Sequence, residues 1–196
     1  MPVKIKIAEP QGTYFITFTC CNWLPLIQLA NAYDSVYKWF DFLVKNGHYI
    51  IGYVIMPNHV HVLISFKNTD QSINTIVGNG KRFMAYEIVK RLKVNGEVKL
   101  LTNLELAVSD KDKLRNKRHE VWKNSFDWKE CNSNEFIEQK LNYIHLNPCQ
   151  RKWNLSNTPE DYKPSSAKFY ICGMQGNYPI TNYLELADIE FSGDTE

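Results

Sequence analysis

The sequence lacks any apolar run long enough to cross a membrane, and it opens without the apolar stretch of a signal peptide. Its five cysteines are odd in number and contain no C-x-x-C pair, which argues against a disulfide framework or a zinc cluster. We therefore expect a cytoplasmic protein with reduced thiols. A chain of 196 residues, 44% of them hydrophobic, is sufficient for one domain with a substantial core.

Basic residues are missing after Lys168. All 23 Lys and Arg residues precede that point or stand at it, whereas five of the 21 acidic residues follow it. A basic body with an acidic tail is typical of proteins with a polyanionic partner such as nucleic acid, although a solvated surface with a disordered tail explains the charges as well. We place one domain at residues 1–170 and an acidic C-terminal tail at residues 171–196.

Hydrophobic periodicity predicts an α+β fold. Strands are expected at 12–21, 48–55, 59–66 and 121–130, where apolar, aromatic and β-branched residues concentrate. Helices are expected at 30–46, 70–93 and 133–147. The order β-α-β-β-α-β-α predicts a ferredoxin-like antiparallel sheet with helices packed on it, followed by one extra C-terminal helix.

Two details of the expected helices follow from local signals. The Gly78-Asn79-Gly80 segment predicts a break or kink in the second helix. Asn132, followed three residues later by Glu135, resembles a capping box at the start of the third helix.

The stretch 94–120 is harder to interpret. Its first part is compatible with a short strand or a pair of strands, and its second part is typical of an exposed, mobile basic loop. We consider several basic side chains as candidates for contact with a DNA backbone, while ordinary solvated surface is an equally good interpretation. These candidates are Lys81, Arg82, Lys111, Lys113, Arg115, Lys117, Arg118 and Lys140.

A pair of histidines opens the strand expected at 59–66. His59 and His61 are two residues apart, so in a strand both side chains point to the same face. Neutral imidazole nitrogen is a common ligand for divalent metal ions, and two imidazoles side by side supply much of a metal site. The spacing alone is explained equally well by two histidines on a solvent-exposed face of the strand that bind no metal.

The helix expected at 133–147 carries a second pair of polar residues. Tyr143 and Asn147 are four residues apart, so they share a helix face, whereas Ile137, Leu141 and Ile144 form the apolar stripe. Tyrosine is a poor nucleophile at neutral pH, but a phosphodiester bound to a metal ion is a strongly activated electrophile. Asn147 is a natural third metal ligand, placed one turn beyond the tyrosine. Ordinary packing of Tyr143 and a helix-terminal role of Asn147 before Pro148 explain either residue taken alone.

Taken together, these segments resemble the single-tyrosine HUH transposases, named for two histidines around a hydrophobic residue, and most closely the REP-associated tyrosine transposase branch. The matching segments are 14–18 (YFITF), 53–61 (YVIMPNHVH), 121–126 (VWKNSF), 142–148 (NYIHLNP) and 159–166 (PEDYKPSS). The resemblance implies that His59 and His61 bind Mg²⁺ or Mn²⁺, with Asn147 at the position of a helix-borne polar ligand. It also implies that Tyr143 attacks single-stranded DNA, which leaves a 5′-phosphotyrosine link and a free 3′-hydroxyl.

Hairpin-forming, REP-like single-stranded DNA is the partner that this resemblance implies. The protein is expected to be a monomer or a homodimer, with Tyr143 completing a site in its own chain or in a partner. A domesticated or inactive member that binds structured single-stranded DNA without cutting it is the main alternative. A ferredoxin-like RNA-binding module is a third possibility, but it leaves the histidine pair and Tyr143 unexplained.

Overall fold

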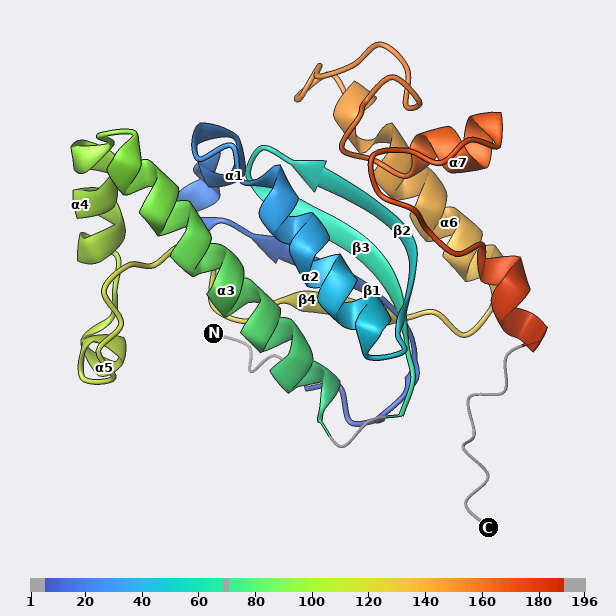
Figure 1. The fold of residues 1–196 in the computed structure, drawn as a ribbon, viewed down its shortest axis with the longest axis horizontal. Coiled ribbons are helices and arrows are strands. Elements are labelled where there is room, and N and C mark those ends of the chain that lie inside the picture. Colours follow the sequence, from blue (N-terminus) through green and yellow to red (C-terminus); the bar gives the residue numbers. More distant parts are fainter. Residues whose placement is uncertain (1–5, 69–70, 189–196) are drawn as a thin grey trace.

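The computed structural model describes residues 6–68 and 71–188. Four strands form one antiparallel sheet in the order β2-β3-β1-β4 (Figure 1). The strands are β1 (Gly12–Thr19), β2 (Tyr49–Met56), β3 (His59–Phe66) and β4 (Asp127–Glu130). This arrangement confirms the ferredoxin-like α+β fold expected from the order of elements.

Two long helices cover one face of the sheet (Figure 1). They are α2 (Tyr33–Lys45) and α3 (Ile73–Val94), and their apolar stripes bury Phe40 and Ile88 in one core with strand residues such as Phe18. Helix α3 continues through its glycines, so the expected break at 78–80 is wrong. Gly80 serves close packing instead, because a Cβ atom there would overlap with the indole ring of Trp39 on α2.

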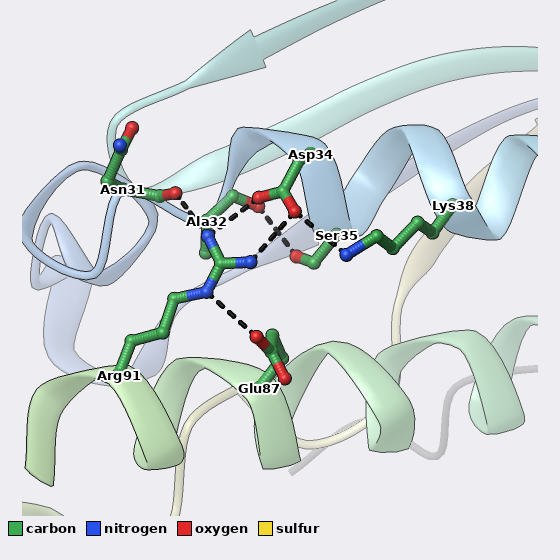
Figure 2. Close-up of polar contacts among 7 residues, drawn as sticks. All are labelled: Asn31, Ala32, Asp34, Ser35, Lys38, Glu87 and Arg91. Atoms are coloured by element: carbon green, nitrogen blue, oxygen red, sulfur yellow. Dashed lines mark hydrogen bonds and ion pairs between the residues drawn. The ribbon is translucent and has the colours of Figure 1, made fainter. Parts of the chain in front are cut away.

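A polar cluster fixes α3 to the start of α2 (Figure 2). The Arg91 guanidinium donates two hydrogen bonds to the Asp34 carboxylate, at 2.7 and 2.8 Å, and a third to Glu87 at 2.9 Å. It also donates to the backbone oxygen of Asn31. The two-point contact with arginine lowers the pKa of Asp34 to about 2.

Helix α6 (Asn134–Leu146) packs on the opposite face of the sheet. Its expected apolar stripe is confirmed, since Ile137, Leu141 and Ile144 are buried in a second core with residues of β2 and β3. Gly52 lets the helix approach, because a Cβ atom there would overlap with Cδ2 of Leu141. The N-cap is Ser133, whose hydroxyl accepts a hydrogen bond from the Phe136 amide, so the expected capping role of Asn132 is wrong.

The stretch between α3 and β4 differs most from expectation. It contains α4 (Val98–Leu106) and α5 (Asp110–Lys113), so the strands considered for its first part are wrong. Burial follows a helical period there, because the covered positions Leu101, Leu104 and Val108 are three to four residues apart and the residues at 102–103 and 105–106 are exposed. The strand expected at 121–130 is restricted to β4, preceded by an isolated bridge between Trp122 and Cys20.

Short elements complete the chain. The segment after β1 forms η1 (Cys21–Trp23) and α1 (Leu26–Leu29), and the segment after α6 forms η2 (Asn147–Cys149), α7 (Ala167–Cys172) and η3 (Tyr183–Asp188). None of the helices in residues 6–68 and 71–188 is both long and apolar enough to span a membrane.

The boundary expected at residue 170 does not separate a domain from a tail. Tyr178 is buried against the first core, where its ring stacks on Tyr37 with centroids 5.7 Å apart and its hydroxyl donates to Asp41. Tyr183 is buried in the second core and donates a hydrogen bond to Glu138. The first part of the expected tail is therefore folded onto the domain, and residues 189–196 lie outside the described residues.

Candidate functional site

The two histidines lie side by side on the sheet face that α6 covers. His59 and His61 are both buried, with ring centroids 4.7 Å apart. In the antiparallel register, His59 is opposite Thr19 and His61 is opposite Thr17 on β1. The rigid central strand thus holds both imidazoles at one end of the sheet, as the i, i+2 spacing predicted.

One ring nitrogen of each histidine is held by a neighbouring side chain. Nδ1 of His59 lies 2.7 Å from Oδ1 of Asn58, and the Asn58 amide nitrogen donates to the backbone oxygen of Trp23. Because Oδ1 can only accept, Nδ1 of His59 carries the proton and its Nε2 keeps a free lone pair. Nδ1 of His61 lies 2.6 Å from the Thr17 hydroxyl, which leaves Nε2 of His61 as the nitrogen facing α6.

Both imidazoles are neutral near pH 7. Burial, assisted by the nearby positive charge of Lys152, lowers the pKa of His59 to about 4. Burial, together with His59 and Lys152, places the pKa of His61 well below its ordinary value. The neutral ring is the form in which histidine binds a metal ion.

Asn147 closes the site from the end of α6. Its Nδ2 lies 3.3 Å from Nε2 of His61, and its side chain is buried. Its Oδ1 is also buried but has no hydrogen-bond partner among the described residues. The amide nitrogen faces His61 in this arrangement, so the amide group would turn over to offer Oδ1 to a divalent cation held by the imidazoles. A bound cation would satisfy this unpartnered buried oxygen. No cluster of three or more His, Cys, Asp or Glu side chains with metal-binding geometry occurs in residues 6–68 and 71–188, so the third protein ligand would be this amide.

Tyr143 lies next to His61. Its ring centroid is 5.3 Å from that of His61 and 6.0 Å from that of Phe15, edge-on in both cases. Tyr143 is 45% exposed, so an incoming substrate can reach this residue from solvent. The histidines and the tyrosine of this arrangement come from one chain.

Lys140 lies one turn before Tyr143 on α6. Its ammonium group is 5.3 Å from the Phe15 ring centroid and 4.7 Å from that of Phe136. This contact with Phe15 brings a positive charge to the ring that also touches Tyr143. Of the basic residues expected to contact DNA, Lys140 is the one placed beside the tyrosine.

A groove of about 1010 Å³ lies between α3 and residues 115–126. Of the other basic candidates, Lys111 and Lys113 are outside its lining, and those that line it are Lys81, Arg82, Arg115, Lys117 and Arg118. Lys113 and Lys117 are paired with acidic neighbours. Lys81 is buried and donates to the backbone oxygens of Lys123 and Ser125, so the interpretation of this residue as ordinary solvated surface is wrong.

Two residues that support the histidines were not identified from the sequence. Asn58 directly precedes His59 in the turn that follows Pro57. This position in the sequence could have predicted that its amide group lies close to the imidazole of His59. Thr17 has no such signal. It is 44 positions from His61 in the chain, and only the register of β1 against β3 brings it into contact.

This geometry defines a ferredoxin-like domain with a histidine pair, an amide and a tyrosine gathered on one face of its sheet. Among solved structures, a REP-associated tyrosine transposase bound to a REP hairpin has the same fold, with a TM-score of 0.59 and 15% sequence identity. The match covers 91% of this chain and 89% of that chain. The fold that the sequence resemblance implied is therefore confirmed.

A second solved structure, described as a candidate transposase from Deinococcus radiodurans R1, matches with a TM-score of 0.34 and 14% identity. That match covers 74% of this chain and 95% of the other, and a TM-score this low does not establish a common fold. No protein-family model and no curated protein sequence matches the chain.

Proposed function

We propose that this protein is a single-strand DNA transposase that cuts and rejoins DNA through Tyr143. The observation that carries the proposal is that Tyr143, His59 and Asn147 all contact His61 in one chain, and that Asn147 keeps an unpartnered buried oxygen. Each of these residues, taken alone, could serve only to stabilise the fold. Cleavage of a phosphodiester bond explains why all of them lie together on one partly exposed face.

Mg²⁺ or Mn²⁺ would be held by Nε2 of His59, Nε2 of His61 and Oδ1 of Asn147. Once bound, the ion would polarise a phosphoryl oxygen and offset the negative charge that develops during attack. The protein supplies two imidazoles that stay neutral at pH 7 and whose second nitrogens are held by Asn58 and Thr17. Such outer contacts orient the ligands before substrate arrives.

In the proposed reaction, the Tyr143 hydroxyl oxygen attacks the scissile phosphorus. A bond forms between that oxygen and phosphorus, and the bond from phosphorus to the 3′ oxygen breaks. The exposed tyrosine releases its proton to water, and the 3′ oxygen leaves as a hydroxyl group. The 5′-phosphotyrosine link retains the energy of the broken bond, so attack by a 3′-hydroxyl rejoins DNA without ATP.

Hairpin DNA is the proposed substrate. The groove between α3 and residues 115–126 has an excess of basic side chains, which is typical of surfaces that bind the phosphate backbone. The transposase of similar fold is described as bound to a REP hairpin. A folded stem against the groove would leave its single-stranded flank free to reach Tyr143.

A covalent-adduct assay tests the proposal. Hairpin oligonucleotides with varied flanks are labelled at the 3′ end, because the fragment downstream of the cut stays on the tyrosine. Incubation with Mn²⁺ or Mg²⁺ should give a labelled protein band that survives denaturation, and Tyr143→Phe should abolish it. Tyr49→Phe is the control, since Tyr49 begins β2 opposite Ser65, at the end of the sheet away from the histidines, and is outside the lining of the groove.

The assay also separates cutting from binding alone. An adduct that persists in Tyr143→Phe would contradict the proposed nucleophile. Tight hairpin binding with no adduct over the whole substrate set would favour a domesticated protein that binds structured single-stranded DNA without cutting it.

A further inference from the structure

Trp23 is an exposed aromatic residue beside the histidine pair. Its side chain is 52% exposed, whereas the other four tryptophans are buried or half-buried. Its ring centroid lies 5.9 Å from that of His59, edge-on at 74°. An indole of this size next to a phosphodiester-cleaving site offers a flat surface to a nucleic-acid base.

The backbone holds this indole in an unfavourable conformation. Asn22 and Trp23 both have positive φ angles, 51° and 58°, which bulky side chains rarely adopt. The Asn58 amide donates a 3.0 Å hydrogen bond to the Trp23 oxygen, and the same side chain binds His59. One asparagine thus fixes the exposed indole relative to the histidine, and strained residues held in this way often have a functional role.

A lysine accompanies the indole. The Lys123 ammonium lies 4.4 Å from the Trp23 ring centroid. The Lys123 amide bonds to the oxygen of Thr19, the residue opposite His59, and Lys123 also lines the basic groove. Lys123 therefore connects the groove to the histidine site and adds positive charge where the phosphate next to a stacked base would pass.

A second pair of the same kind lies on another side of His59. The Trp153 ring centroid is 5.4 Å from that of His59, and the Lys152 ammonium is 5.5 Å from the Trp153 ring centroid. His59 is thus in contact with two indoles, each accompanied by a lysine. Alternating aromatic surface and positive charge is the pattern by which proteins hold single-stranded nucleic acid without reading its sequence.

We propose that Trp23 and Lys123 form a subsite that holds one nucleotide of single-stranded DNA next to the scissile phosphate. The Trp23 indole stacks on the base, and the Lys123 ammonium contacts the adjoining phosphate. The inference rests on the proposed function for the location of the scissile phosphate, and it specifies which part of a hairpin substrate the subsite binds. The ligand is the single-stranded flank, and the duplex stem binds elsewhere.

Binding to two hairpins tests this subsite. They share one stem, one is blunt and the other carries a mixed-sequence single-stranded extension. Binding is measured in the Tyr143→Phe background with EDTA, so that neither cleavage nor metal contributes. Trp23→Ala should weaken binding of the extended hairpin about 5- to 100-fold and leave the blunt hairpin unchanged, because stacking involves only the flank.

Conservative and distant variants complete the test. Trp23→Phe should retain most of the affinity because it keeps an aromatic face, and Lys123→Ala should reduce the salt dependence of binding to the extended hairpin. Phe42→Ala, at an exposed aromatic on α2 outside the lining of the groove, should change neither hairpin. Equal affinity of Trp23→Ala and the parent for the extended hairpin, or an equal loss for both hairpins, would overturn the proposal.

The subsite and the proposed function fail in different ways. Loss of extended-hairpin binding in Trp23→Ala supports the subsite even when no adduct forms with the parent protein. An adduct with unchanged Trp23→Ala binding supports the function and overturns the subsite. Thermal unfolding of each variant identifies any loss of binding that arises from misfolding. We expect Trp23→Ala to fold, because the hydrogen bond from Asn58 goes to the backbone oxygen of residue 23 and does not need its side chain.

Discussion

The hydroxyl group of Thr17 lies 2.6 Å from Nδ1 of His61. This contact joins two strands, β1 and β3, and it decides which nitrogen of His61 faces Asn147 at the end of α6. A ring without this contact is free to rotate or change tautomer, so its lone pair is no longer fixed towards one point. Thr17 is therefore a positioning residue of the proposed metal site.

Thr17→Val replaces this hydroxyl group with a methyl group of similar size. We expect Mn²⁺ affinity to fall about 10- to 100-fold, as is common when a group that orients a metal-binding histidine is removed. Titration calorimetry on the protein without DNA measures this directly. Thr17→Ser keeps the hydroxyl group and should retain most of the affinity; a Thr17→Val protein that binds Mn²⁺ normally would contradict the positioning role.

Two glycines in α3 should respond to alanine in opposite ways. Gly80→Ala places a methyl group against Trp39, and we expect the free energy of unfolding to fall by about 1–3 kcal/mol. A methyl group at Gly78 would point into open space, with no neighbouring side chain within 4 Å, so Gly78→Ala should stabilise the helix by up to about 1 kcal/mol. Urea denaturation of both variants measures the difference, and equal effects would refute close packing at Gly80.

The contact between Asp34 and Arg91 should make stability depend on pH in the acid range. Because the pKa of Asp34 is lowered from 3.8 to about 2 in the folded protein, the ionised carboxylate stabilises the fold above about pH 4. This contribution is lost as pH falls towards 2. Asp34 is partly exposed, so we expect about 1 kcal/mol after solvent screening.

Unfolding of Asp34→Asn measures that contribution. The difference from the parent protein should be present at pH 6 and should shrink between pH 4 and pH 2. Asp110→Asn is the control, because that carboxylate is exposed and pairs only with the neighbouring Lys113 among the contacts of residues 6–68 and 71–188. A difference from Asp34→Asn that persists unchanged at pH 2 would contradict the assignment.

Variants of two basic residues, Arg118 and Lys111, distinguish a direct DNA contact in the groove from a general effect of positive charge on DNA binding. Arg118 lines the groove between α3 and residues 115–126, whereas Lys111 does not. Arg118→Ala should weaken hairpin binding and reduce the slope of log affinity against log salt by about 1, because one phosphate contact is lost. Lys111→Ala removes the same charge and should leave both quantities close to those of the parent; equal losses would refute binding in the groove.

The sequence by itself determined the local geometry on which the site depends. A strand period of two places His59 and His61 on one face, and a helix period places Asn147 one turn beyond Tyr143. The order of strands and helices also predicted the ferredoxin-like sheet, because each element carries its own hydrophobic pattern.

Only the tertiary structure decided how these elements meet. Contacts such as Thr17 with His61, Gly80 with Trp39 and Tyr178 with Tyr37 join residues far apart in the chain, and no local period encodes them. The same packing buried Lys81, which its own helix would have left in solvent. The motif supplies the reactive groups, and the packing of α6 and β1 around β3 brings them together and fixes their direction.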